Sequence, residues 1–410
     1  FWAKWTPATY KVTLNTNGGT IAPGKDVTQY TYGVGAKLPT KNDITLQNDE
    51  FDGWYENSSF TGTAVTEITT SDYGDKEYWA KWKKPGAFLY TDGEFEIKDT
   101  PGPSKQVEKA YYDWEQNFDC FAVPWEAEKS KIKTLRINAP TMYMPAVPGD
   151  DNFSKGLHSM FSDCTNLTTI LQNDIKMDNV TQLTGMFARC RSLTNISKLS
   201  TWDTSKMTSM GGIFLGCYAL TDLSPISNWK FDSATDMRSV FDGCRALTDL
   251  TPIKNWTFPE ALDMNNFLSD VAVSDLSPIA GWTFPKVTNM SGFFCDNSAL
   301  VDASPIKNWK FPKLERITAF FMDCVNLTTV RFNDEAIAQV QALKSGGEGI
   351  GDPTGDIFEY CPSLVGPNNV TTNFDPDNWK SGNPVNWQGF CVGTGGSTWG
   401  TDKGYLWPMN

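Results

Sequence analysis

The residue types that usually perform catalysis or bind metals are few in this sequence, and they lie far apart. The chain of 410 residues has a single histidine, His158, and its nine cysteines form no Cys-x-x-Cys pair. It also has no Gly-x-Gly-x-x-Gly run and no phosphate-binding loop. Catalysis needs a nucleophile beside a base, two carboxylates in unlike environments, or a metal site. We therefore expect a protein that is not an enzyme and uses no metal or cofactor, with His158 at or near the surface.

One set of acidic residues recurs at a regular spacing and is the candidate ligand-binding site. Each member lies between two apolar positions of a short segment that we expect to be a strand. The four residues are Asp222, Asp249, Asp275 and Asp302. Like charges on adjacent strands repel one another unless they are hydrogen-bonded or countered. Two interpretations follow: the carboxylates bond neighbouring backbone or hydroxyl groups and shape the strand, or they line a surface for a basic partner.

These aspartates belong to a repeat that extends from Leu157 to Leu364. Its most regular feature is a Phe three residues before a Cys, as in Phe241-Asp-Gly-Cys244. The Phe residues of this register are Phe161, Phe187, Phe214, Phe241, Phe267, Phe294, Phe321 and Phe358. Their spacing is 26 or 27 residues, except for a last step of 37 that carries an insertion. A fixed period of this length indicates a solenoid, in which each unit buries its apolar face against its neighbours.

Each unit is predicted to contain one short helix and one short strand. Apolar residues from Met237 to Leu247 have helical spacing, and Leu247–Ile253 has the composition of a strand. The predicted fold is therefore an α/β leucine-rich-repeat solenoid with a parallel sheet plus short helices. A Trp that returns in most units is expected in the core, at Trp202, Trp229, Trp256, Trp282 and Trp309.

The segment Trp202–Met210, followed by Ile213–Cys217 and Leu220, resembles the BspA-like (Mycoplasma-type) leucine-rich repeats of bacterial surface proteins. The sequence departs from that pattern at Asp270 and Asn297, which stand where a Cys is expected. The resemblance implies a cell-surface or secreted bacterial adhesin. Its implied partner is a protein or glycan of a host or neighbouring cell.

A second, longer repeat opens the chain. Residues 1–5 (Phe-Trp-Ala-Lys-Trp) return almost unchanged at Tyr78–Trp82. Between them, Tyr10–Leu14 alternates polar and apolar residues like a strand, and Asn17-Gly18-Gly19 supplies a turn. Together with Phe51–Tyr55, these pieces resemble the internalin-type B repeat (the Listeria–Bacteroides repeat), which implies a small β-grasp-like spacer domain.

Five segments follow from these patterns. They are the end of a preceding B repeat (1–5), the B repeat (8–83), an N-terminal cap (84–156), eight repeats (157–365) and a C-terminal cap (366–410). The C-terminal cap is rich in tryptophan, including Trp387 and Trp399, so a carbohydrate-binding module is one alternative function. A structural surface-layer protein is another.

The charge, the apolar runs and the cysteines of the chain limit the classes of partner and the cell compartment that we expect. The net charge of −13 disfavours nucleic acid and anionic membranes as partners. No apolar run reaches the ~18 residues that a membrane span needs. The sequence begins without a Met, so we interpret it as a piece of a longer protein, and the resemblance implies that this protein is extracellular. Six cysteines share one repeat position and are expected to be buried thiols; Cys361 with Cys391 is the one possible disulfide.

Overall fold

The computed structural model describes residues 6–47, 49–98, 105–112, 123–138, 157–173, 177, 180–343, 357–361, 363–364 and 406–407. These residues belong to two compact units. The first comprises residues 1–92 and 96–117, and the second comprises residues 93–95 and 118–410. The boundary that we placed after residue 83 stays a prediction.

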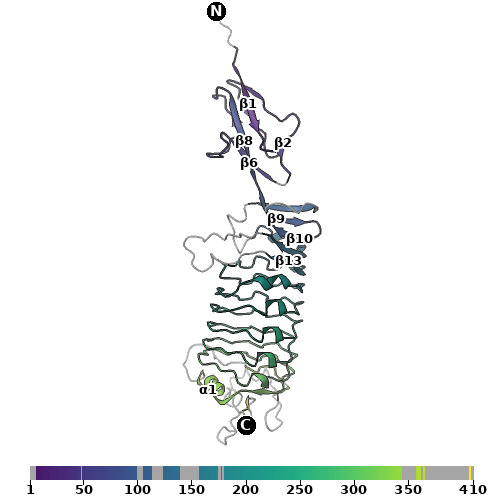
Figure 1. Cartoon of the computed structure of the whole chain (residues 1–410), viewed down its shortest axis with the longest axis vertical. Helices are drawn as coiled ribbons and strands as arrows, with labels where there is room; N and C mark the ends of the chain where they lie inside the picture. The colour runs from purple at the N-terminus through teal and green to yellow at the C-terminus, as the bar shows by residue number, and fades with distance from the viewer. Residues whose placement is uncertain are drawn as a thin grey trace, which may run out of the picture. The chain divides into compact units, whose positions relative to one another are not determined.

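The first unit is built on a four-stranded sheet in which its first long strand and its last one are neighbours. The strand order is β3-β1-β8-β6, with β1 parallel to β8 and the two outer pairs antiparallel. Figure 1 shows β1, β6 and β8 side by side. The bounds are β1 Thr9–Asn15, β3 Gln29–Thr31, β6 Glu50–Tyr55 and β8 Lys76–Lys83. The predicted turn follows β1, where Asn17 and Gly18 have φ of 48° and 95°.

One cluster of buried side chains fills this module. It consists of Val12, Tyr30, Leu38, Ile44, Trp54, Ile68, Tyr78 and Ala80. Two antiparallel pairs flank it, formed by β2 Thr20–Ile21 with β5 Ile44–Thr45 and by β4 Ala36–Lys37 with β7 Glu67–Ile68. After the module, β9 (Pro85–Tyr90) pairs with β11 (Val107–Tyr112), and β10 is Glu94–Ile97. Every residue of the buried cluster lies between residues 8 and 83, which is consistent with a module that has its own core.

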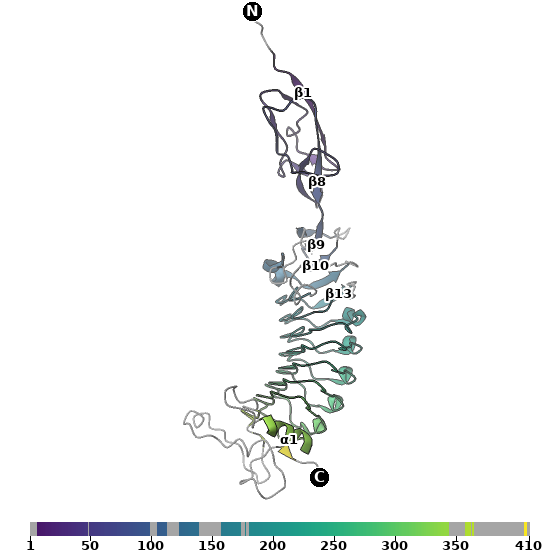
Figure 2. The ribbon, with the colours of Figure 1, turned by 90° about the vertical axis from the view of Figure 1, so that its left-hand side faces the viewer.

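The second unit is a stack of parallel repeats (Figures 1 and 2). It begins with β12 (Thr134–Ile137), which pairs in parallel with β13 (Thr169–Asn173). A ladder of single parallel bridges then connects successive repeats through Gln182, Ser209, Asp236, Asp263, Asn289 and Arg316. Short 3-10 helices lie above one another along one side of the stack, as Figure 2 shows. They are η3 Ser197–Thr201, η4 Ser224–Ile226, η5 Thr251–Ile253, η6 Ser277–Ile279 and η7 Ser304–Ile306. A further one, η1 (Glu126–Lys131), precedes β12.

The predicted helix in each repeat is wrong: the register Phe lies in a series of turns. Every second backbone N–H group in these turns donates to a carbonyl of the next repeat, as the N–H groups of Gly185 and Phe187 do. The N–H group of Met186, between them, donates to the Leu183 carbonyl of its own repeat. An α-helix would keep all of these bonds within one segment. This alternation goes with a positive φ two residues before and two residues after the register position. The residues before it are Ser159, Gly185, Gly212, Ser239, Asn266, Gly292 and Ala319. The residues after it are Asp163, Arg189, Gly216, Gly243, Asp270, Asp296, Asp323 and Tyr360.

The same hydrogen bonds correct the register by one residue in the fifth repeat. Phe241 N–H donates to the Phe267 carbonyl, and Leu268 N–H donates to the Phe293 carbonyl. In the other repeats, the accepting carbonyl belongs to the residue before the register position. Leu268, and not Phe267, is therefore the register residue. Asp270 occupies the positive-φ position, so Val271 stands at the cysteine position.

Aromatic rings form continuous columns inside the stack. Phe161, Phe187, Phe214 and Phe241 stack face to face, with adjacent ring centroids 6.0–6.1 Å apart. The five repeat tryptophans are buried, as predicted. Four of them donate their indole N–H to a backbone carbonyl of the preceding repeat, at 3.1–3.3 Å. Each repeat thus completes both the apolar core and the hydrogen bonding of its neighbour.

Near the end of the described repeats, β14 (Val330–Arg331) leads into α1 (Asp334–Leu343), and β14 pairs in parallel with β15 (Leu406–Trp407). Apart from β15, the predicted C-terminal cap with Trp387, Trp399 and Cys391 lies outside the described residues, as do residues 1–5. Among the residues that the structure describes, no helix combines the length and the apolar character that crossing a bilayer requires.

Candidate functional site

The four aspartates of the candidate site are exposed and occupy equivalent positions in four successive repeats. The predicted strand around them is wrong, because each precedes a 3-10 helix of three residues. The Oδ1 atom of each aspartate accepts the N–H of the residue two positions later, at 2.7–2.8 Å. Asp302 additionally accepts the Ser304 hydroxyl and makes a parallel bridge to Thr329. Each carboxylate therefore starts a 3-10 turn and still faces solvent.

Local hydrogen bonds favour the charged form of the two central aspartates. Bonds from the side chain and the backbone N–H of Thr251 lower the pKa of Asp249. Equivalent bonds from Ser277 lower the pKa of Asp275, although the neighbouring charge of Asp249 opposes the shift. Successive carboxylates of the row lie one repeat apart, which is roughly 4.8 Å in a parallel stack. Both interpretations of the aspartates agree with this geometry: they shape the backbone and they remain accessible.

A second polar row lies on the parallel ladder. The Ser209 hydroxyl donates to Asp236 at 2.9 Å, and Arg238 contacts the same carboxylate through Nε and Nη2. The side-chain amide of Asn289 donates to Asp263 at 3.1 Å. Because these groups satisfy one another, they consolidate the ladder and leave no pair of a nucleophile and a base.

Cysteines at one repeat position form a hydrogen-bonded column inside the stack. Seven cysteines of the described residues are buried. The thiol of Cys217 donates to the Phe187 carbonyl of the preceding repeat at 3.2 Å, and the same bond recurs at four other cysteines: Cys190, Cys244, Cys324 and Cys361. Asn297 makes the bond with its amide, which donates to the Leu268 carbonyl at 2.9 Å. The position therefore selects a small hydrogen-bond donor, and Val271 is its apolar exception.

We expect Cys190, Cys217 and Cys244 to resist thiol reagents until the protein unfolds. Burial raises the pKa of all three thiols, so the reactive thiolate is scarce, and the sulfur atoms are inaccessible. Titration with a chromogenic disulfide should detect these thiols only in denaturant. Stoichiometric reaction of the native protein, or a mass that requires disulfides among them, would contradict the buried column.

The single histidine is buried, whereas we predicted a position at or near the surface. His158 is 4% exposed, and its burial lowers the pKa of the imidazole, against a hydrogen bond with Gln182 that raises it. His158 is buried because it lies immediately before the positive-φ turn at Ser159, where each repeat covers its neighbour. No cluster of His, Cys, Asp or Glu within the described ranges has the arrangement of a metal site.

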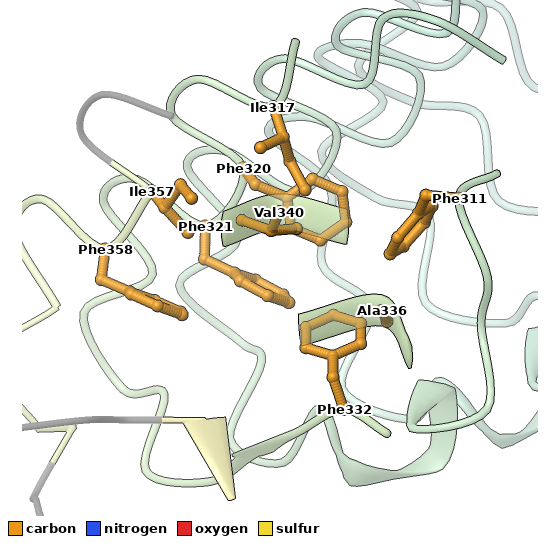
Figure 3. Close-up of a pocket in the computed structure, with 9 residues that line it drawn as sticks. All are labelled: Phe311, Ile317, Phe320, Phe321, Phe332, Ala336, Val340, Ile357 and Phe358. Atoms are coloured by element: carbon orange, nitrogen blue, oxygen red, sulfur yellow. The ribbon is translucent and has the colours of Figure 1, made fainter. Parts of the chain in front are cut away.

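An apolar pocket lies where α1 meets the last repeats. Phe332, Ala336 and Val340 contribute one wall, and the register residues Phe321 and Phe358 contribute another (Figure 3). Its nine lining residues are all apolar, so the pocket has no side chain that could act as an acid, a base or a nucleophile. Its chemistry is limited to packing against apolar groups.

A basic and aromatic cluster on the turns was not anticipated. The guanidinium carbons of Arg191 and Arg245 lie 5.4 and 4.7 Å from the centre of the Tyr218 ring. The three residues occupy the same repeat position, directly after a Cys, as Cys-Arg-Ser, Cys-Tyr-Ala and Cys-Arg-Ala show in the sequence. That shared position was the available signal. Whether side chains at that position contact one another depends on the distance between stacked repeats, which the sequence period alone does not give.

Comparison with known families agrees with the repeats. Residues 155–277 and 263–345 match the family model described as "Mycoplasma protein of unknown function, DUF285". The repeat region matches the DUF285 family. The matched region contains the four aspartates, the cysteine column up to Cys324 and the Arg191–Tyr218–Arg245 cluster. Among curated proteins, no relative matches the chain.

Two solved structures are similar to the chain at low sequence identity. A leucine-rich cell surface protein from Faecalibacterium prausnitzii A2-165 is 13% identical, with a TM-score of 0.22, covering 72% of this chain and 94% of that one. A leucine-rich repeat protein from Eubacterium ventriosum ATCC 27560 is 14% identical, with a TM-score of 0.25, covering 69% and 82%.

Proposed function

We propose that the chain is part of a bacterial cell-surface or secreted protein whose leucine-rich-repeat solenoid binds a basic surface on a protein of a host or neighbouring cell. The observation that carries the proposal is the row of Asp222, Asp249, Asp275 and Asp302. The carboxylates are exposed, regularly spaced and already oriented by backbone hydrogen bonds. In this proposal, residues 8–83 serve as an internalin-type spacer.

The physical advantage of such a row lies in association. Several like charges at fixed spacing attract a basic partner over a distance, raise the association rate and make binding weaken as salt is added. The local hydrogen bonds fix the carboxylates, so less rotamer freedom is lost on binding. A stack of rigid repeats also offers a broad surface, which suits a macromolecule better than a small substrate.

We expect the double variant Asp249→Asn/Asp275→Asn to weaken binding to an immobilised lysine-rich peptide about tenfold at low salt. Asparagine removes the charge but keeps an oxygen that can accept the N–H of Thr251 or Ser277, so the 3-10 turns should persist. Surface plasmon resonance at two salt concentrations measures the change. Because the pKa of both aspartates is lowered, wild-type binding should be nearly constant from pH 5 to 8.

The matched control is Asp203→Asn/Asp232→Asn, which removes the same charge from exposed positions outside the row. Asp203 makes the same kind of local bond, accepting the Ser205 N–H at 3.0 Å. An equal loss of affinity in both double variants would mean that only net charge matters. In that case, the row would have a structural role and the partner would bind elsewhere.

A further inference from the structure

The turns that carry the register Phe hold arginine side chains against carboxylates in neighbouring repeats. Arg189 contacts both oxygens of Asp163 in the preceding repeat, with Nε–Oδ1 at 2.7 Å and Nη2–Oδ2 at 2.8 Å. Arg245 donates from Nε to Asp270 in the following repeat at 2.7 Å. In both pairs, the aspartate occupies the positive-φ position two residues after the register residue. This surface therefore already recognises carboxylates.

Arg191 occupies the same repeat position as Arg245, but it lacks the corresponding carboxylate. The residue that would supply it is Gly216, which has φ +68° at the position equivalent to Asp270. The side chain of Arg191 is exposed, and its guanidinium lies over the Tyr218 ring. The cation–π contact orients the guanidinium without using its N–H donors.

We propose that Arg191, with Tyr218 and Arg245, forms a docking point for a carboxylate of an acidic protein segment. A partner's Glu or Asp side chain would take the place that Asp270 takes beside Arg245. The site is separate from the acidic row and has the opposite preference, so it stands whether or not that row binds a basic partner.

The geometry favours a peptide carboxylate over a stacked sugar. The two arginines come from the repeats before and after Tyr218, and both guanidinium groups lie over the faces of its ring. A sugar that stacks on an aromatic residue needs one of those faces open. The planar guanidinium, in contrast, keeps a fork of donors that fits a carboxylate in the plane.

The test measures binding of a fluorescein-labelled glutamate-rich peptide to the full chain by fluorescence anisotropy at low salt. Arg191→Gln should raise the Kd about tenfold, as expected for the loss of a charge-assisted hydrogen bond. Gly216→Asp should weaken the peptide similarly, because it supplies an internal carboxylate. That substitution is feasible, since four aspartates already adopt this φ, and the new Cβ would lie 3.3 Å from the flexible Arg189 side chain.

Two further variants decide the outcome. Asp270→Asn should lower the Kd severalfold, because it frees the Arg245 guanidinium, whereas Lys206→Gln, which removes an exposed positive charge elsewhere, should change it less than twofold. The proposal is overturned if the wild type does not bind the peptide, if Lys206→Gln and Arg191→Gln act alike, or if Gly216→Asp leaves the Kd unchanged. Tighter binding of a sulfated polysaccharide that is insensitive to Arg191→Gln would also overturn it.

Discussion

Replacing Phe241 by Ala should lower the free energy of unfolding by about 3–5 kcal/mol, which is the range for a large aromatic residue removed from a core. Phe241 is fully buried, and its ring lies within 6.0 Å of the rings of Phe214, Trp256 and Phe267, measured between centroids. Truncation would open a cavity in the aromatic column, where each ring packs against the repeat before and the repeat after.

Urea unfolding, followed by tryptophan fluorescence, measures the loss. The control is Leu262→Ala, since Leu262 belongs to the next repeat but is 43% exposed, and it should cost less than about 1 kcal/mol. If Phe241→Ala and Leu262→Ala destabilise the protein equally, the apolar face of the repeat has been assigned to the wrong side.

The second large effect is expected at Gly35 in the N-terminal module. Gly35 has φ +74°, and a Cβ atom there would lie 2.3 Å from the carbonyl oxygen of Ile68. Backbone must move to relieve that contact, because the carbonyl belongs to the adjacent strand β7. We expect Gly35→Ala to cost about 3–4 kcal/mol, which combines the positive-φ penalty with an overpacking penalty.

Gly33 provides a matched control two residues away. Its φ is +83°, but a Cβ atom there would have no neighbour within 4 Å. Gly33→Ala should therefore show the conformational penalty alone, about 1–2 kcal/mol. Thermal unfolding of the isolated fragment 8–83 measures both, and the wild-type fragment should itself unfold cooperatively. Equal losses at Gly33 and Gly35 would show that the close approach to Ile68 is absent in solution.

The sequence was sufficient to predict the period of the repeats and most of the buried positions. Phe241, Trp256 and Cys244 recur because every repeat needs the same side chain to cover its neighbour, and recurrence is visible without coordinates. The parallel ladder could also be expected, although in the central repeats we placed its strand too late in the unit. The bridge positions precede the register residue, whereas the segment from Leu247 begins a 3-10 turn.

The local conformation could not be predicted from apolar spacing. Residues at spacings of three and four suggested a helix, but the same spacing suits turns whose alternate N–H groups point to the next repeat. Gly212 and Gly216 on either side of Phe214 were the contrary signal, because glycine in a helix interior is unfavourable and glycine at positive φ is not. The adjacent Phe267 and Leu268 hid the one-residue shift because both are apolar. The hydrogen bonds between repeats and the positive φ of Asp270 fix the alignment.

The candidate site was predictable in composition but not in geometry. The regular spacing of Asp222, Asp249, Asp275 and Asp302 implied an exposed row, and the carboxylates are exposed. That they each accept the N–H two residues later depends on the 3-10 turn, which we did not predict. The absence of a carboxylate at the Gly216 position beside Arg191 was harder to predict, because it is visible only when Gly216 is compared with Asp270 in an equivalent turn.

The alternate hydrogen bonds between repeats also determine how the stack would respond to mechanical tension. These bonds run from one repeat to the next, so a pull applied between the first and the last repeat loads the interfaces in series. An end repeat, which has one neighbour instead of two, would detach first. Each detachment before the 37-residue last step would release 26 or 27 residues of chain, or roughly 90 Å when fully extended. The molecule would therefore lengthen in steps of nearly uniform size and would absorb work with each repeat that opens.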